Sequence, residues 1–155
     1  MFEKILVCLD GSALAENILP HATEIARRFN SRVYLLHVVP EPVAAAPGIP
    51  GVSGGPIETP RMLEQMREEE RSTQAYLETL AGPMREQGLE VETVLLQGSA
   101  NDAIVSYAED NDIGLIAMVS HGHSGLGHAL MGSVADHVLK KAGRPVLMVK
   151  LAKRH

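Results

Sequence analysis

The residues with the most chemical potential lie in one short stretch, VSHGHSGLGHALMGSVADHV, from Val119 to Val138. It contains four glycines, three serines and four histidines. Glycine lets the backbone come close to a ligand, a serine hydroxyl can donate a hydrogen bond or act as a nucleophile, and imidazole binds metals. The stretch is therefore compatible with a phosphate cradle, a metal site, a serine nucleophile or a polar loop before a helix.

Motif spacing argues against most familiar forms of this chemistry. No G-x-x-x-x-G-K-[ST] loop occurs in the chain. Leu126 stands where the serine-hydrolase elbow G-x-S-x-G needs its second glycine, and Leu130 stands where a dinucleotide fingerprint needs glycine or alanine. His121, His123 and His128 have no metal-motif spacing and no carboxylate between them. We therefore expect no metal site made of protein ligands alone.

A phosphate cradle is the chemistry that this loop fits best. Gly122 and the glycines after it allow tight turns close to a ligand. Gly132 and Ser133 then begin a predicted helix, whose free N–H groups and dipole favour an anion. The Ser133 hydroxyl can donate to a phosphate oxygen. Alternatively, Ser133 caps this helix, with Asp136 as the acid of a capping box; both interpretations can hold at once.

Five short apolar runs predict the strands that position this loop: KILVCL, RVYLLHVV, VETVLL, IGLIAMV and PVLMVK. Their lack of alternation is typical of parallel strands buried on both faces. Helices are predicted between them over 12–29, 60–88, 99–111 and 132–143. Ser12 is the expected N-cap of the first, Pro20 should bend it, and Gly82–Pro83 should kink or restart the second. This alternation predicts one domain, 1–155, with an open doubly wound α/β fold.

A loop over residues 40–60 interrupts the alternation. It carries six prolines and four glycines and cannot hold regular structure. A loop of this length is either functional, for example as a lid, or an untethered spacer.

The composition indicates a cytoplasmic protein that binds neither nucleic acid nor membranes. The formal net charge is −5, and basic residues cluster only in the terminal KLAKRH. The N-terminal MFEKILVCLD holds an apolar run that is too short for a signal peptide or a membrane helix. Cys8 is the only cysteine and lies in that run, so we expect a buried, inert thiol.

Polar and glycine residues follow four of the predicted strands, as LDGS, PEP, QGSAND and VSHGHSGLG. In an open α/β sheet, ligands bind beyond the carboxyl ends of the strands, where the strand order reverses. The sequence therefore predicts a binding crevice at this edge of the sheet, whatever its ligand.

These motifs together resemble the universal stress protein family over essentially the full chain. Nucleotide-binding members carry G-x2-G-x9-G-[ST] after the fourth strand, and Gly122, nine residues and then Gly132–Ser133 reproduce the last two thirds of that motif. KILVCLDGS, LLHVV and GSVADHVLKKAGRPVLMVK are also similar to the family. The resemblance implies a five-stranded parallel sheet in the order 3-2-1-4-5, with four helices and the reversal between strands one and four.

The resemblance also implies a site for ATP, and leaves open whether Mg²⁺ binds with it. Asp10 would lie near the ribose and phosphates, main-chain groups at Val38 would read the adenine, and the glycine loop would hold the phosphates. The full set of nucleotide-binding residues implied in this way is Cys8, Asp10, Gly11, Ser12, Val38, Met118, Ser120, His121, Gly122, His123, Gly132, Ser133 and Val134.

Two positions depart from the family pattern. Val119 stands where the motif has its first glycine, and a β-branched residue adds bulk and restricts the backbone there. His123 stands where relatives often carry arginine, which is always charged, whereas histidine is mostly neutral at pH 7. The sequence predicts ATP binding, with these two positions as the ones that would weaken it or make it pH-sensitive.

Three functions remain open at this stage. The leading hypothesis is a cytosolic ATP- or adenine-nucleotide-binding stress protein that acts as a sensor or regulator. Turnover should be slow or absent, because the glycine loop has no lysine or arginine to stabilise phosphoryl transfer. The alternatives are a nucleotide-free homodimer that binds a regulatory protein partner, favoured by Val119, and a slow ATP hydrolase using Asp10. The last strand is an apolar edge, so a homodimer through 145–150 is expected, and the family resemblance implies the same.

Overall fold

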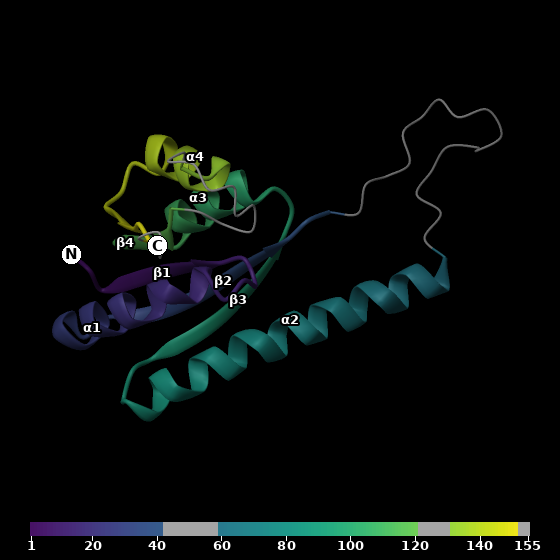
Figure 1. The fold of residues 1–155 in the computed structure, drawn as a ribbon, viewed down its shortest axis with the longest axis horizontal. Helices are drawn as coiled ribbons and strands as arrows, with labels where there is room; N and C mark the ends of the chain where they lie inside the picture. Colours follow the sequence, from purple (N-terminus) through teal and green to yellow (C-terminus); the bar gives the residue numbers. More distant parts are fainter. Residues whose placement is uncertain (42–58, 121–130, 152–155) are drawn as a thin grey trace.

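The structure is a computed structural model that describes residues 1–41, 59–120 and 131–151. Its centre is a five-stranded, all-parallel sheet (Figure 1). The strands are β1 (Lys4–Leu9), β2 (Arg32–Val39), β3 (Val91–Gln97), β4 (Leu115–Val119) and β5 (Val146–Val149). Their order is β3-β2-β1-β4-β5, which confirms the predicted fold class.

Alternate side chains of each central strand enter two separate cores. In β1, Ile5, Val7 and Leu9 contribute to one core, while Leu6 and Cys8 contribute to the other. This period of two follows from strand geometry. Because both faces are covered, the strand is apolar throughout, as its sequence predicted.

Helices cover the two faces of the sheet in pairs (Figure 1). The helices are the 3₁₀ turn η1 (Ala15–Ile18), α1 (Leu19–Phe29), α2 (Pro60–Glu86), α3 (Ala100–Asp110) and α4 (Ser133–Lys141). Residues of η1, α1 and α2 pack on the core around Ile5, and residues of α3 and α4 pack on the core around Leu6. In the described part of the chain, no helix is both long and apolar enough to cross a membrane.

The structure corrects the expected start of the first helix and excludes a restart in the second. The first helical segment does not begin at Ser12: the 3₁₀ turn comes first, and α1 follows with Pro20 in its opening turn. Proline fits there because the N–H groups of a first turn have no partner within the helix. The second helix is not restarted at Pro83, and α2 continues to Glu86.

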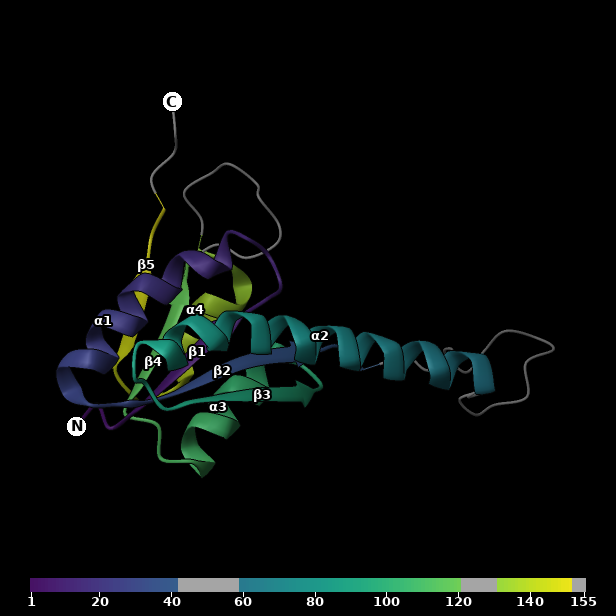
Figure 2. The same cartoon turned by 90° about the horizontal axis from the view of Figure 1, so that it is seen from below.

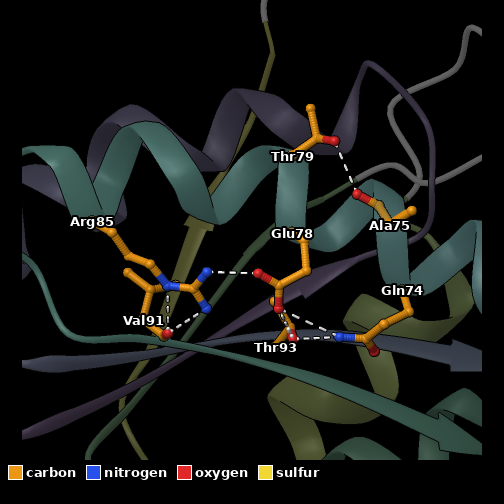
Figure 3. Close-up of polar contacts among 7 residues, drawn as sticks. All are labelled: Gln74, Ala75, Glu78, Thr79, Arg85, Val91 and Thr93. Carbon is orange, nitrogen blue, oxygen red and sulfur yellow. Dashed lines mark hydrogen bonds and ion pairs between the residues drawn. The ribbon is translucent and has the colours of Figure 1, made fainter.

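Helix α2 is longer than the sheet that it covers. Its C-terminal half buries Leu77, Ala81 and Met84, whereas its N-terminal half extends past the strands, where Met62 is 47% exposed (Figure 2). Side-chain hydrogen bonds join the covered half to the edge strand β3. Thr93 donates to Glu78 at 2.7 Å, and Arg85 donates to the carbonyl oxygen of Val91 (Figure 3).

The two edge strands of the sheet differ in character. β3 carries exposed Glu92 and Gln97, and Glu92 forms an ion pair with Arg32 at 3.8 Å. β5 consists of Val146–Val149, all apolar and all half-buried. One edge is therefore charged and the other apolar.

Candidate functional site

The carboxyl ends of β1 and β4 lie side by side at the switch point of the sheet. The two strands pair in parallel, with Val7 opposite Ala117. The chain leaves β1 toward β2 on one side and leaves β4 toward β5 on the other. Asp10 directly follows β1 and Ser120 directly follows β4. The structure thus brings two of the predicted turns together, at the place where open α/β sheets bind ligands.

Asp10 is held in a compact turn by its neighbour Ser12. Its Oδ1 accepts hydrogen bonds from the Ser12 backbone N–H at 2.9 Å and from the Ser12 hydroxyl at 2.5 Å. Gly11 between them has φ +83°, a left-handed conformation that glycine adopts without steric cost. Both bonds use Oδ1, and no described residue donates to Oδ2. One carboxylate oxygen is therefore fixed, and the other is available to a ligand donor.

Ser12 differs from its predicted role as the N-cap of a long helix. Its Oγ accepts the backbone N–H of Ala15 at 3.1 Å, so it supports the start of the 3₁₀ turn. The prediction failed because Ser12 works inside the Asp10 turn, which separates β1 from the helical region. This role ties the first helical residue to the carboxylate through one hydroxyl.

The end of β2 provides an open strand edge beside this turn. His37 is opposite Leu9, the last residue of β1, and its Nδ1 lies 3.0 Å from the Leu9 carbonyl oxygen. Val38 therefore extends beyond β1 on that side, while it remains paired with Leu96 of β3 on the other. The main-chain groups of Val38 on the β1 side could therefore form hydrogen bonds with the edge of a planar ligand. The His37 side chain is half-buried.

Helix α4 points its N-terminus to the same edge of the sheet. Gly132 is the N-cap and Ser133 is the first helical residue. A glycine has no side chain with which to accept first-turn N–H groups, and those groups have no acceptor within the helix. The N-terminus of α4, including Ser133 and Val134, can therefore accept an anion.

The capping-box interpretation of this helix is wrong. The Asp136 carboxylate accepts from Lys140 at 2.8 Å, and its backbone N–H donates to the Gly132 carbonyl oxygen at 2.9 Å. Gly132 holds the cap position, so the side chain of Ser133 is exposed rather than folded back as a cap. Ser133 is consequently free for the alternative role of donating to a ligand.

Two predicted site residues have buried side chains. Cys8 and Met118 lie in the core beneath α3 and α4, with 8% and 6% exposure. Burial raises the pKa of the Cys8 thiol to about 12, so it stays protonated and inert near neutral pH, as predicted. Ser120 is also buried at the end of β4.

The side chain of Val119 points into the core and not into the predicted crevice. It is 6% exposed and belongs to the core that also contains Leu9 and Ala15. Alternation along β4 sends Leu115, Ala117 and Val119 to this core. The extra volume relative to glycine is therefore absorbed by packing beneath η1 and α1.

Tyr76 was not anticipated as a neighbour of the site. Its hydroxyl donates to Glu16 at 2.8 Å, and burial, followed by this bond and the nearby Glu16 and Asp10 charges, raises the Tyr76 pKa. No sequence signal marks this contact, because the two residues are distant along the chain. The remaining predicted residues, His121, Gly122 and His123, lie outside the described residues, as does His128. Within 1–41, 59–120 and 131–151, no cluster of three or more metal-ligand side chains occurs.

An open parallel sheet with a carboxylate turn and a helix N-terminus at its switch point defines a doubly wound α/β protein with a candidate site for an anionic ligand. Comparison with known proteins narrows this class. The chain belongs to the universal stress protein family, whose model matches residues 1–150.

Individual relatives extend over nearly the whole chain. Universal stress protein MJ0531 of Methanocaldococcus jannaschii is 32% identical over 154 residues, covering 99% of this chain and 85% of its own. The solved structure of MJ0577 from the same organism has a TM-score of 0.83 at 29% identity and covers 99% of both chains. The Archaeoglobus fulgidus universal stress protein in complex with dAMP has a TM-score of 0.62 at 27% identity, covering 97% of this chain and all of its own.

Proposed function

We propose that the protein binds an adenine nucleotide, ATP in the first instance, between the ends of β1 and β4, and acts as a cytosolic stress-response sensor or regulator. The observation that carries this proposal is the position of the Asp10 turn and the N-terminus of α4, which follow the ends of the paired strands β1 and β4 at the switch point. The dAMP complex of the Archaeoglobus fulgidus relative supports an adenine nucleotide as the ligand class.

Each part of the described site suits one part of a nucleotide. The free oxygen of Asp10 can accept from a ribose hydroxyl, and the strand edge at Val38 can hydrogen-bond the adenine. N–H groups at Ser133 and Val134, with the Ser133 hydroxyl, can donate to phosphate oxygens. His121, Gly122 and His123 are proposed to complete the phosphate contacts. Asp10 can also supply one oxygen to Mg²⁺ held by the phosphates.

The packing of Val119 weighs against the nucleotide-free alternative. That alternative rested on valine closing the crevice, whereas the side chain lies in the core at 6% exposure. A slow ATP hydrolase remains a second proposal, which would require phosphate release that is lost in Asp10→Ala. We also propose a homodimer through β5, whose apolar edge favours pairing with another chain.

Calorimetric titration of nucleotide-stripped protein with ATP and Mg²⁺ tests the proposal. We expect micromolar binding that Ser133→Ala weakens by about threefold to tenfold, the effect of losing one hydrogen bond. Ser106→Ala is the matched control, because Ser106 is an exposed serine on α3. A wild-type protein that gives no binding heat up to millimolar ATP would refute nucleotide binding.

A further inference from the structure

One hydrogen bond joins the long helix α2 to the turn that carries Asp10. The hydroxyl of Tyr76 donates to Oε1 of Glu16 at 2.8 Å, and both side chains are half-buried. Glu16 lies in η1, immediately after Ala15, whose N–H donates to the hydroxyl of Ser12. A continuous path of contacts therefore runs from α2 through η1 to the carboxylate of Asp10.

Helix α2 does not depend on this bond for its own position. Gln74 donates to Thr93 at 2.6 Å, Thr93 donates to Glu78, and Arg85 donates to Glu78 at 2.6 Å and to the Val91 carbonyl oxygen (Figure 3). These bonds fasten α2 to β3. Leu77, Ala81 and Met84 also bury their side chains in the core.

The side-chain hydrogen bonds of the Asp10 turn, in contrast, are local to it. Asp10 and Ser12 bond only to each other and to Ala15 among the described residues. Burial of Ala15 and Ile18 in the core holds η1 against the sheet, and the bond between Tyr76 and Glu16 adds a directional side-chain link from α2 to η1.

We propose that Tyr76 is a positioning residue for the nucleotide site, because its bond to Glu16 fixes the turn that orients the Asp10 carboxylate. This inference rests on the proposed function. Tyr76 itself contacts no nucleotide and acts through Glu16.

Tyr76→Phe tests the inference, because it removes the hydroxyl and keeps the ring in the core. We expect the affinity for AMP to fall by about threefold to tenfold, the effect of one ordinary hydrogen bond, because Tyr76 acts on the site only through Glu16. In nucleotide-free protein, amide hydrogen exchange should accelerate over residues 11–18 and stay unchanged over residues 77–86. Tyr107→Phe is the matched control: this half-buried tyrosine lies on α3, against the other core.

Variants of the partner separate positioning from general packing. Glu16→Gln keeps an acceptor oxygen and should retain most of the affinity, whereas Glu16→Ala should match Tyr76→Phe. Tyr76→Phe added to Glu16→Ala should cause no further loss, as expected for two residues acting through one interaction. Additive losses, or exchange that accelerates along α2, would overturn the inference.

Failure of this inference is distinguishable from failure of the proposed function. If wild-type protein binds neither ATP nor AMP, nucleotide binding is refuted, and with it the role of Tyr76 at a nucleotide site. Exchange over residues 11–18 without nucleotide would still show whether Tyr76 restrains the turn. If wild-type protein binds AMP and Tyr76→Phe binds equally well, only the positioning role is overturned.

Discussion

The N–H of Gly132 donates to the carbonyl oxygen of Ser120 at 2.7 Å, which joins the residue after β4 to the N-cap of α4. Ser120 in turn donates its N–H to the carbonyl oxygen of Val149 in β5, at 3.0 Å. Backbone hydrogen bonds therefore fix the N-terminus of α4 relative to the sheet. The direction in which its first-turn N–H groups point is set by the fold and does not depend on a ligand.

Asp10 is expected to have two roles. Its negative charge interacts with the ligand, and its Oδ1 stabilises the turn by accepting from Ser12. Asp10→Asn retains a carbonyl oxygen that can accept from Ser12, so unfolding free energy should change by less than about 0.5 kcal/mol while nucleotide affinity falls. Asp10→Ala should lose affinity and also about 1 kcal/mol of stability. Calorimetry and urea unfolding measure the two effects, and equal stability of both variants would contradict the role of Oδ1.

Gly11 is needed for its backbone conformation rather than for space. At φ +83°, alanine is strained, although its Cβ would meet only the His37 ring, at 3.8 Å. Gly11→Ala should therefore cost about 1–2 kcal/mol in urea unfolding. The control is Gly82→Ala in α2, where an added Cβ would meet no atom of a neighbouring element within 4 Å. This change should stabilise the helix by up to about 1 kcal/mol. Opposite signs for the two glycines are the expected result.

Val119→Ala separates core packing from access to the site. Because the side chain is buried among core residues, truncation should cost about 1–3 kcal/mol of stability. Nucleotide affinity, measured well below the melting temperature, should stay within about twofold. A large gain in affinity would show instead that valine obstructs the ligand.

Cys8 is expected to make stability fall at high pH. Its pKa is raised by burial to about 12, so the folded protein keeps a proton that the unfolded chain loses above about pH 8.5. The stability that the protonated Cys8 thiol contributes to the folded state is fully present below that pH and is lost as pH rises toward 12. The raised pKa values of Tyr76 and Tyr107 act in the same direction, so the slope must be compared with that of Cys8→Ala. Equal slopes in the two proteins would contradict a buried thiol.

The proposed homodimer predicts a light-scattering mass of two chains. Because the β5 edge is apolar, the mass should change little between low and high salt. Glu92→Ala, on the opposite edge strand, should leave the mass unchanged. A mass of one chain at micromolar concentration would refute pairing through β5.

The strands and the doubly wound class of the fold were predictable from the sequence because burial on both faces leaves a strong apolar signal, whereas the strand order was implied by the family resemblance. Cys8 and Leu36, for example, lie opposite each other in strands whose central residues are apolar. The location of Asp10 at the site was also predictable, since the carboxyl ends of parallel strands share one edge. These features depend on local pattern and a few general rules of topology.

Other features were not predictable because neighbouring residues compete for the same role. Ser12 and Ser133 both have a side chain that is typical of an N-cap. However, the Ser12 hydroxyl donates to Asp10 in the turn, and Gly132 rather than Ser133 is the N-cap of α4. The bond between Tyr76 and Glu16 spans 60 residues and depends on how α2 crosses the sheet. No local propensity encodes such a contact.

In the proposed homodimer, the difference between the two sheet edges would limit assembly to two copies. A chain that pairs through β5 presents its charged β3 to the outside, where Glu92 and Gln97 discourage another strand from adding. Pairing of like edges about a two-fold axis then closes after two copies, whereas an open filament would need two complementary edges on each chain. The sheet can therefore be extended once, across a symmetry axis, without becoming a template for fibres.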